Sequence, residues 1–318
     1  MHRLRFSAGI TLALLLVCVP KPHETRADER SGVRETFRVA GYLPDYRLAE
    51  FNADATRTLT DLILFSAEPT LEGEIELERL NAVPWDRLHE LKRRQRLRLI
   101  LCVGGWDRSK HFAVVAASRE ARTRFVQSAL RICRTHQLDG LDIDWEHPQN
   151  ERDQTDYAWL LAELRDGFRP HALKLSVTQA AWQQLPAEAY TAVNFVQLMS
   201  YDHKGRHSTL EQAQADVKSL LDRGIPREKL VLGLPFYGRL LADPDKSSTY
   251  AEIAAKHRIG PHVDEVEGLY FNGPNTIRRK TRFALESRLG GVMVWEIGQD
   301  ARGDASLLSV IRDTIAKP

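Results

Sequence analysis

The sequence predicts an α/β fold in which a single domain forms a (β/α)8 TIM barrel, and three observations carry this prediction. The chain has 318 residues, 43% of them hydrophobic, which is enough for one large barrel core. Short apolar runs alternate with amphipathic stretches from residue 37 onward. Polar and aromatic residues stand at the carboxyl ends of the apolar runs, where the strands of a barrel meet at one mouth.

Eight apolar runs have the length and residue types of β-strands. They cover residues 37–44, 61–68, 96–105, 138–146, 172–180, 193–202, 229–238 and 290–298. Helical patterns fill most of the intervals and cover residues 85–94, 119–136, 155–168, 209–223, 275–288 and 305–315. A doubly wound sheet shows the same alternation, so the order of elements does not separate the two folds. The barrel is favoured by the residues that would gather at its mouth, namely Tyr42, Phe65, Trp106, Glu146, Gln179, Tyr201, Tyr237 and Trp295.

Residues 239–273 form the longest irregular stretch, between the seventh and eighth predicted strands. A short helix is expected within it at residues 247–257. Because about 35 residues are too few for an independent domain, we expect one domain over residues 37–318, without a full insertion domain between strands seven and eight.

The N-terminus has the features of an export signal. His2, Arg3 and Arg5 precede a ten-residue apolar run at residues 10–19, and Ala27 offers a small residue for cleavage. The run is too short to anchor the mature protein across a bilayer. We therefore expect residues 1–27 to be a signal peptide and residues 28–36 a polar segment, with the mature protein secreted or periplasmic. Anchoring by lipidation at Cys18 is disfavoured because Val17 is bulky where a small residue is expected.

The charge balance of the mature chain is close to neutral. Removal of residues 1–27 reduces 45 basic and 43 acidic residues to 41 and 42, a net charge of −1. This balance excludes a cationic surface for nucleic acid or anionic lipid. Cys102 lies in an apolar strand pattern and Cys133 in a helical one, so we expect buried thiols and no disulfide framework.

The run LDGLDIDWEHP, residues 138–148, concentrates carboxylates in an apolar strand. Because side chains alternate along a strand, Asp142, Asp144 and Glu146 share one face. The other face, which we expect to pack against helices, carries Leu141, Ile143 and Trp145. Burying three carboxylates on one face of a strand costs free energy, so stability alone does not explain this pattern. Simple capping or pairing with basic residues is therefore disfavoured.

Neighbouring carboxylates on this face lie roughly 6 to 7 Å apart, near enough to raise one another's proton affinity. Glu146, the last of the row, is expected to hold a proton and act as general acid. Three carboxylates also suit Mg²⁺ or Ca²⁺, but the row provides no His, and we expect no metal. The histidines elsewhere lack metal-ligand spacing and are expected in solvated or loop positions, namely His111, His203 and His207.

The run DGLDIDWE, residues 139–146, resembles the DGxDxDxE signature of glycoside hydrolase family 18, the family of chitinases and endo-β-N-acetylglucosaminidases, which fold as (β/α)8 barrels. Five further runs resemble motifs of that family in the same order, along almost the whole predicted mature chain. They are AGYLPDY at 40–46, LCVGGW at 101–106, QLMSYDHKG at 197–205, LPFYGR at 234–239 and GGVMVWEIG at 290–298.

The resemblance implies a retaining, substrate-assisted mechanism, in which the N-acetyl oxygen of the substrate attacks the anomeric carbon and forms an oxazolinium ion. It makes Glu146 the general acid and base, while Asp144 stabilises the acetamide nitrogen and shares a proton with Asp142. The phenol of Tyr201 would bond the acetamide carbonyl. The sugars would be bound by Tyr42, Phe65, Gly105, Trp106, Met199, Asp202, Tyr237, Arg239 and Trp295.

Two features depart from the family pattern. Cys102 stands where the family usually has Ser, and we expect it to tune the barrel core without loss of function. Residues 239–273 are too few for the small insertion domain of many family chitinases, so a deep tunnel and processive action are disfavoured.

The leading interpretation is a secreted chitinase-type hydrolase of β-1,4-linked N-acetylglucosamine that needs no cofactor and acts as a monomer. One alternative is an endo-β-N-acetylglucosaminidase that cuts the chitobiose core of N-glycans, and peptidoglycan-derived sugars are a third class of substrate. A non-catalytic, lectin-like barrel is the alternative from another class of protein. It is disfavoured because such members typically lose the acid, and Glu146 is present.

Overall fold

The computed structural model describes residues 1–2 and 37–317. Residues 3–27 of the predicted signal peptide, with Cys18, and the predicted polar segment 28–36 lie outside the described residues. Within the described part of the chain, no helix has the length and apolar character needed to cross a membrane.

Eight parallel strands close into a barrel, as predicted. The hydrogen-bonded order is β1-β13-β8-β7-β6-β5-β4-β2, and β2 pairs again with β1, from Ala40 beside Asp61 to Pro44 beside Phe65. The barrel strands are β1 Arg38–Pro44, β2 Asp61–Pro69, β4 Arg98–Gly104, β5 Gly140–Asp144, β6 Lys174–Ala180, β7 Phe195–Met199, β8 Leu230–Pro235 and β13 Gly291–Trp295. A two-residue strand, β3 (Ile75–Glu76), pairs antiparallel with β2.

Helices surround the barrel, and most lie where the sequence predicts them. They are α2 Trp85–Gln95, α3 Phe112–Ala117, α4 Arg119–Thr135, α5 Glu151–Phe168, α6 Ala187–Ala192, α7 Leu210–Asp222, α9 Pro274–Glu286 and α10 Leu307–Ala316. The six-residue helices α3 and α6 were not predicted, because one and a half turns show no clear period. Between β1 and β2 the chain forms two 3-10 helices, Asp45–Glu50 and Ala53–Arg57, in place of an α-helix.

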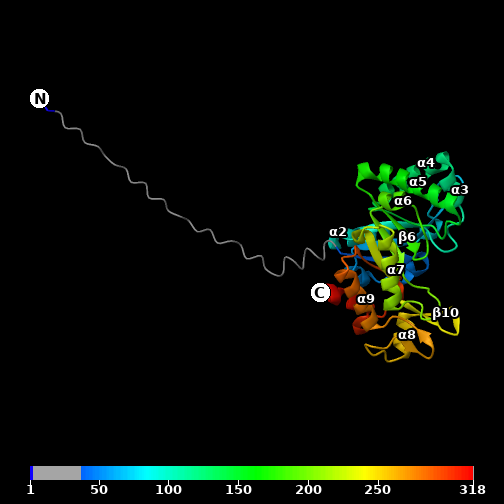
Figure 1. Ribbon diagram of the computed structural model, residues 1–318, viewed down its shortest axis with the longest axis vertical. Helices are drawn as coiled ribbons and strands as arrows, with labels where there is room; N and C mark the ends of the chain where they lie inside the picture. Colours follow the sequence, from blue (N-terminus) through cyan, green and yellow to red (C-terminus); the bar gives the residue numbers. More distant parts are fainter. Residues whose placement is uncertain (3–36, 318) are drawn as a thin grey trace.

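Residues 237–270, between the seventh and eighth barrel strands, form a small antiparallel sheet with one helix, so the prediction of an irregular stretch was wrong. Its elements are β9 Tyr237–Leu240, β10 Asp243–Thr249, α8 Tyr250–Lys256, β11 Glu265–Val266 and β12 Leu269–Tyr270. The sequence of β10, DPDKSST, has no apolar face because its residues are exposed or half-buried, so no alternation marks it as a strand. The prediction that no full insertion domain is present is confirmed. Figure 1 shows α8 and β10 at the opposite end of the molecule from α4 and α5.

Two sets of buried side chains hold the barrel. The larger set lies between the strands and the helices and includes Leu141, Ile143 and Trp145 of the predicted apolar face. The smaller set fills the barrel interior and comprises Ala40, Tyr42, Ile63, Phe65, Ile100, Cys102, Phe195, Val231 and Met293. Cys102 is therefore part of the interior, and both Cys102 and Cys133 are buried free thiols.

A buried carboxylate joins three strands at the amino end of the barrel. Asp61, the first residue of β2, is fully buried and accepts hydrogen bonds from Arg98 Nε at 2.5 Å and Arg98 Nη2 at 2.7 Å. Arg38 Nη1 donates to the same carboxylate at 2.8 Å. Burial opposes ionisation, but the hydrogen bond and charge of Arg98 and the charge of Arg38 lower the pKa of Asp61.

Replacing Asp61 by Asn should lower the free energy of unfolding by about 3 kcal/mol, because two half-buried guanidinium groups would lose their shared counter-charge. Thermal denaturation at pH 7 measures this loss. The matched control is Asp222→Asn, which breaks the exposed pair with Lys218 and should cost less than about 0.5 kcal/mol. Equal losses in the two variants would contradict the structural role of Asp61.

Candidate active site

A cavity of about 440 Å³ opens at the carboxyl ends of the barrel strands. Its lining residues are Tyr42, Phe65, Trp106, Asp144, Glu146, Thr178, Met199, Tyr201, Asp202, Arg239 and Trp295. Ten of the thirteen residues predicted from the sequence are in this set, and Thr178 is an addition. A second cleft of about 500 Å³, between residues 43–58 and 297–312, shares no residue with it.

Asp142 lies on β5 below the cavity and is fully buried. Its carboxylate accepts hydrogen bonds from Ser176 Oγ at 2.6 Å, Tyr42 Oη at 2.8 Å and Thr178 Oγ1 at 2.9 Å. Gln197 Nε2 donates to Tyr42 Oη at 2.7 Å and holds the phenol in place. The carboxylate is therefore held by neutral hydroxyl donors, which satisfy it without adding a charge.

Asp144 lies one step higher on the same face of β5 and is 3% exposed. Burial raises the pKa of Asp144 well above its usual value, and the charges of Glu146 and Asp142 raise it further. Its Oδ1 atom is buried and has no hydrogen-bond partner among the described residues. Asp144 thus lines the cavity and keeps a buried oxygen without a partner.

Gly104 and Gly105 provide the room for this arrangement. Both have a φ of +101°, which a residue with a side chain rarely adopts. A Cβ on Gly104 would lie 2.3 Å from the Asp144 carbonyl oxygen, and one on Gly105 would lie 2.4 Å from the ring of Phe65. Gly105, predicted to contact substrate, is not among the residues that line the cavity, and its missing side chain leaves room for the Phe65 ring.

Glu146 follows the end of β5, so the row of acids reaches beyond the strand. Its side chain is 13% exposed, and burial together with the charge of Asp202 raises its pKa to about 7. Ser109, which the sequence analysis did not identify, fixes the backbone at Glu146. Its Oγ accepts from the Glu146 backbone N–H at 3.0 Å and lies 3.0 Å from the Asp144 carbonyl oxygen. His147 Nε2 lies 3.4 Å from Glu146 Oε2.

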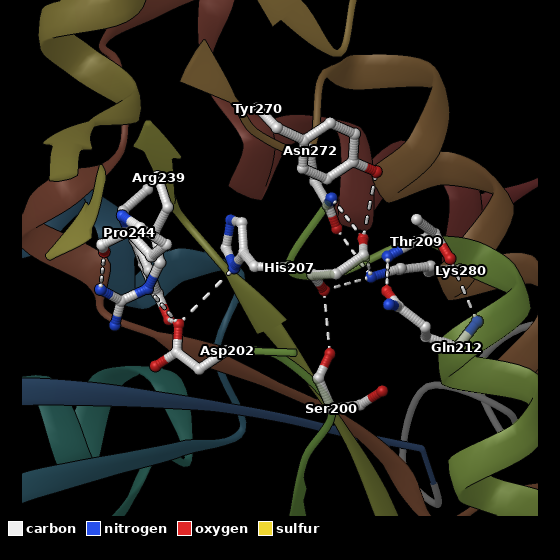
Figure 2. A network of polar contacts seen from close by, with 12 residues as sticks. Ser200, Asp202, His207, Thr209, Gln212, Arg239, Pro244, Tyr270, Asn272 and Lys280 are labelled. Carbon is white, nitrogen blue, oxygen red and sulfur yellow. Dashed lines mark hydrogen bonds and ion pairs between the residues drawn. The ribbon is translucent and has the colours of Figure 1, made fainter. Parts of the chain in front are cut away.

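The loop after β7 brings a third carboxylate, Asp202, to the cavity; Figure 2 shows its contacts. Asp202 has a φ of +63° and accepts hydrogen bonds from Tyr237 Oη at 2.6 Å and Arg239 Nε at 2.5 Å. Burial opposes ionisation, but the nearby His207 ring and the hydrogen bonds from Arg239 and Tyr237 hold the pKa of Asp202 below its usual range. Tyr237 and Arg239 belong to β9 of the small sheet, whereas the sequence placed Tyr237 in the seventh barrel strand. Asp202 therefore stays charged opposite Glu146.

His207 lies in the loop after β7, as expected, but it is not solvated. It is 1% exposed, its ring stacks on Tyr237 with centroids 5.1 Å apart, and its Nδ1 lies 3.6 Å from Asp202 Oδ1. Gln179 is a second correction. It is buried beside Tyr190 of α6, because the inward positions on β6 are taken by Ser176 and Thr178.

Aromatic rings form the rest of the cavity wall. The ring centroid of Trp295 lies 5.3 Å from that of Tyr42 and 4.7 Å from that of Phe65. Trp106 stands at the rim, where 69% of its surface is exposed. Burial raises the pKa of Tyr201 well above its usual value, so its phenol stays protonated and can donate a hydrogen bond. Such walls suit the C–H faces of a sugar ring.

Three polar groups surround an aromatic pocket. Glu146 is a carboxylic acid with a pKa of about 7, Asp144 has a buried oxygen without a partner, and Tyr201 is a phenolic donor. This arrangement suits proton transfer to a bound neutral ligand. Among the described residues, no group of His, Cys, Asp and Glu has the geometry to hold a metal ion.

Comparisons with known proteins agree with this geometry. The family model for glycosyl hydrolases family 18 matches residues 38–300. A probable chitinase of Drosophila melanogaster is 26% identical, in an alignment that covers 68% of this chain and 59% of that protein. The chain spans about three-fifths of the length of the curated relatives it matches first.

Solved structures give the same picture. A family 18 chitinase from Flavobacterium johnsoniae is 27% identical, with a TM-score of 0.78 over 88% of this chain and 94% of that one. A mutant family 18 chitinase from Cycas revoluta, solved with (GlcNAc)4, is 25% identical, with a TM-score of 0.76 over 87% and 99%.

The carboxyl group of Glu146 should titrate with a midpoint near pH 7, and Asp202→Asn should lower that midpoint, because it removes a negative charge that favours the protonated acid. Infrared difference spectra between each protein and its Glu146→Gln counterpart measure the titration. Asp222→Asn, on the exposed surface of α7, is the control and should leave the midpoint unchanged. A midpoint near the ordinary pKa of glutamate would contradict this description of the site.

Proposed function

Because this chain belongs to family 18 of the glycosyl hydrolases, we propose that it is a chitinase-type enzyme that cleaves β-1,4 linkages in polymers or oligomers of N-acetylglucosamine. The observation that carries the proposal is the cavity at the end of β5, where Glu146, with a pKa near 7, stands above the buried Asp144 and among aromatic rings. Chitinase names among the relatives, and the GlcNAc oligomer in the Cycas structure, support the same substrate class.

The reaction we propose uses the substrate as its own nucleophile. The acetamide carbonyl oxygen attacks the anomeric carbon, the bond to the leaving oxygen breaks, and Glu146 gives its proton to that oxygen. A bicyclic oxazolinium ion results. Glu146, now a carboxylate, takes a proton from water while the water oxygen attacks the anomeric carbon, which reopens the ring with retained configuration. The proton is available below a pH of about 7 and is lost as the pH rises through that value.

Two buried acids, Asp144 and Asp142, would stabilise the acetamide nitrogen during the reaction. The unpaired Oδ1 of Asp144 is an acceptor for the acetamide N–H, and its carboxylate would stabilise the positive charge that develops on that nitrogen. Asp142 lies directly below, with its own oxygens held by the hydroxyls of Ser176, Thr178 and Tyr42. A proton shared between the two acids lets Asp144 change its charge during the cycle without exposure to water.

Tyr201 and Asp202 would fix the reacting sugar. Among the described residues, the Tyr201 phenol has only a long contact with Met293 Sδ, at 4.0 Å, so its proton is free for the acetamide carbonyl. Holding that carbonyl near the anomeric carbon makes the attack intramolecular, which lowers its entropic cost. Asp202 and Arg239 offer charged partners for sugar hydroxyls, and Trp295 provides the apolar floor.

We propose further that the protein is exported, on the strength of the basic start and apolar run of residues 1–27, and that it acts as a monomer. N-terminal sequencing of protein recovered from outside the cytoplasm tests the first proposal, with a new N-terminus near residue 28 as the supporting result.

Glu146→Gln should reduce hydrolysis of chitotetraose by about 10² to 10⁴, because the amide cannot donate the catalytic proton. Binding of chitotetraose, measured by calorimetry, should persist. The control is Glu151→Gln, at the exposed start of α5, which should keep normal activity. Unchanged hydrolysis by the Glu146 variant would refute the assigned acid, and binding without hydrolysis by the unmodified protein would favour a lectin-like barrel.

A product analysis separates the substrate classes. Chitin oligomers and an N-glycoprotein with intact glycans are incubated in parallel, and the released sugars are separated by mass. We expect chitobiose from the oligomers and no change in the glycoprotein, which is the result for a chitinase-type enzyme. Trimming of the glycoprotein with intact oligomers would identify an endo-β-N-acetylglucosaminidase.

A further inference from the structure

A fully buried lysine lies behind the loop that carries Asp202 (Figure 2). Lys280 stands on α9, and its Nζ contacts Ser208 O at 2.9 Å, Ser208 Oγ at 2.6 Å and Asn272 Oδ1 at 2.8 Å. None of the ion pairs in the described part of the chain involves it. Burial is the main reason why its pKa falls to about 7, although the charges of Asp264, Asp216 and Glu211 oppose the shift. An ammonium group here is costly, and methionine would fill the same volume without that cost.

The neighbours of Lys280 show which protonation state the network fits. The Ser208 hydroxyl donates its single proton to the Ser200 carbonyl at 2.9 Å, so toward Lys280 its oxygen can only accept. Asn272 Nδ2 donates to the Ser208 carbonyl at 2.7 Å, which leaves its Oδ1 as the acceptor facing Lys280. All three contacts of Nζ are therefore acceptors, and three acceptors require the three protons of an ammonium group.

Ser208 ends the loop that begins at Asp202. Its carbonyl receives Lys280 Nζ, Asn272 Nδ2 and, at 3.4 Å, Tyr270 Oη. Within the loop, the backbone N–H of His203 donates to the carbonyl of His207 at 3.1 Å. The loop is thus closed on itself and fastened at its end to α9 and to the small sheet.

The same loop places His207 beside Asp202, Tyr237 and Arg239, the cluster that the proposed function assigns to sugar binding. Its ring stacks on Tyr237, and its Nδ1 lies 3.6 Å from the Asp202 oxygen that also binds Tyr237 and Arg239. His207 is the residue directly before Ser208, so a shift of Ser208 moves the ring that packs against this cluster. Asp202 itself is held at a φ of +63°, a conformation that persists only when its surroundings impose it.

We propose that Lys280 is a positioning residue for substrate binding: its ammonium group holds Ser208, and through Ser208 and His207 it maintains Asp202, Tyr237 and Arg239 in the arrangement that binds sugar. The proposal rests on the proposed function, because it assigns the cluster to the substrate. Lys280 touches no reacting atom, so its effect falls on binding and not on the chemical step.

Lys280→Met tests the proposal. The KM for chitotetraose should rise about tenfold, the effect expected from losing hydrogen bonds to a charged group, with kcat changed less than about twofold. Hydrogen–deuterium exchange without substrate should quicken in the peptide that spans residues 203–209 and stay normal in β5. Ser208→Ala keeps the carbonyl but removes one acceptor, so it should give a smaller rise in KM and a smaller increase in exchange. It provides the test if Lys280→Met fails to fold.

The matched control is Lys229→Met. Lys229 also donates to backbone carbonyls, those of Tyr190 at 2.9 Å and Val193 at 2.8 Å, but at the amino end of β8, away from the cavity. It should leave KM and the exchange of residues 203–209 unchanged, whatever it does to the melting temperature. A normal KM, or normal exchange of residues 203–209, in both the Lys280 and Ser208 variants would overturn the proposal. Absence of chitotetraose hydrolysis by the unmodified protein would instead refute the proposed function, and the exchange data would still decide whether Lys280 holds the loop.

Discussion

The burial of two carboxylates at the centre of the barrel is the constraint on which the rest of the site depends. Asp142 and Asp144 lie one above the other on β5, and no ion pair reaches either of them in the described part of the chain. Hydroxyl groups from β1 and β6 satisfy the lower acid, and its neighbour keeps an unpaired oxygen. Burial and the charges of its two acidic neighbours raise the pKa of Asp144, while burial and the charge of Asp202 raise that of Glu146 to about 7, so Glu146 keeps a proton near neutral pH.

The loops and the small sheet provide the parts of the site that the barrel strands do not. Ser109, from the loop after β4, holds the backbone on either side of Trp145, so the acid is positioned by an element other than its own. On the opposite side of the cavity, the loop after β7 meets β9 of the small sheet, and Asp202 joins them through Tyr237 and Arg239. The insertion is short, yet it provides part of the cavity wall, which is the way barrels vary function on a common frame.

Much of the fold and site follows from local pattern. Alternation in residues 138–146 separated the acidic from the apolar face, and the family motifs marked Tyr201 and Trp295, which do line the cavity. Local pattern fails where no periodicity exists. The strand β10 is polar on both faces, and α3 is shorter than two turns, so neither produces a signal that distinguishes it from a loop. Gln179 was misplaced because its neighbours Ser176 and Thr178 take the inward positions.

The sequence alone therefore determined the barrel and the row of acids that ends at Glu146, the proposed general acid, since each depends on spacing within a single strand or on the order of strands. Only the tertiary structure decided which distant groups meet. Lys280 reaches Ser208 from 72 residues away, Tyr42 reaches Asp142 from 100, and His207 of the loop after β7 is buried against Tyr237 of the small sheet. Such contacts form when the barrel closes and the insertion folds onto it. Because these residues are far apart in the chain, the spacing of residues in the sequence does not predict which of them meet.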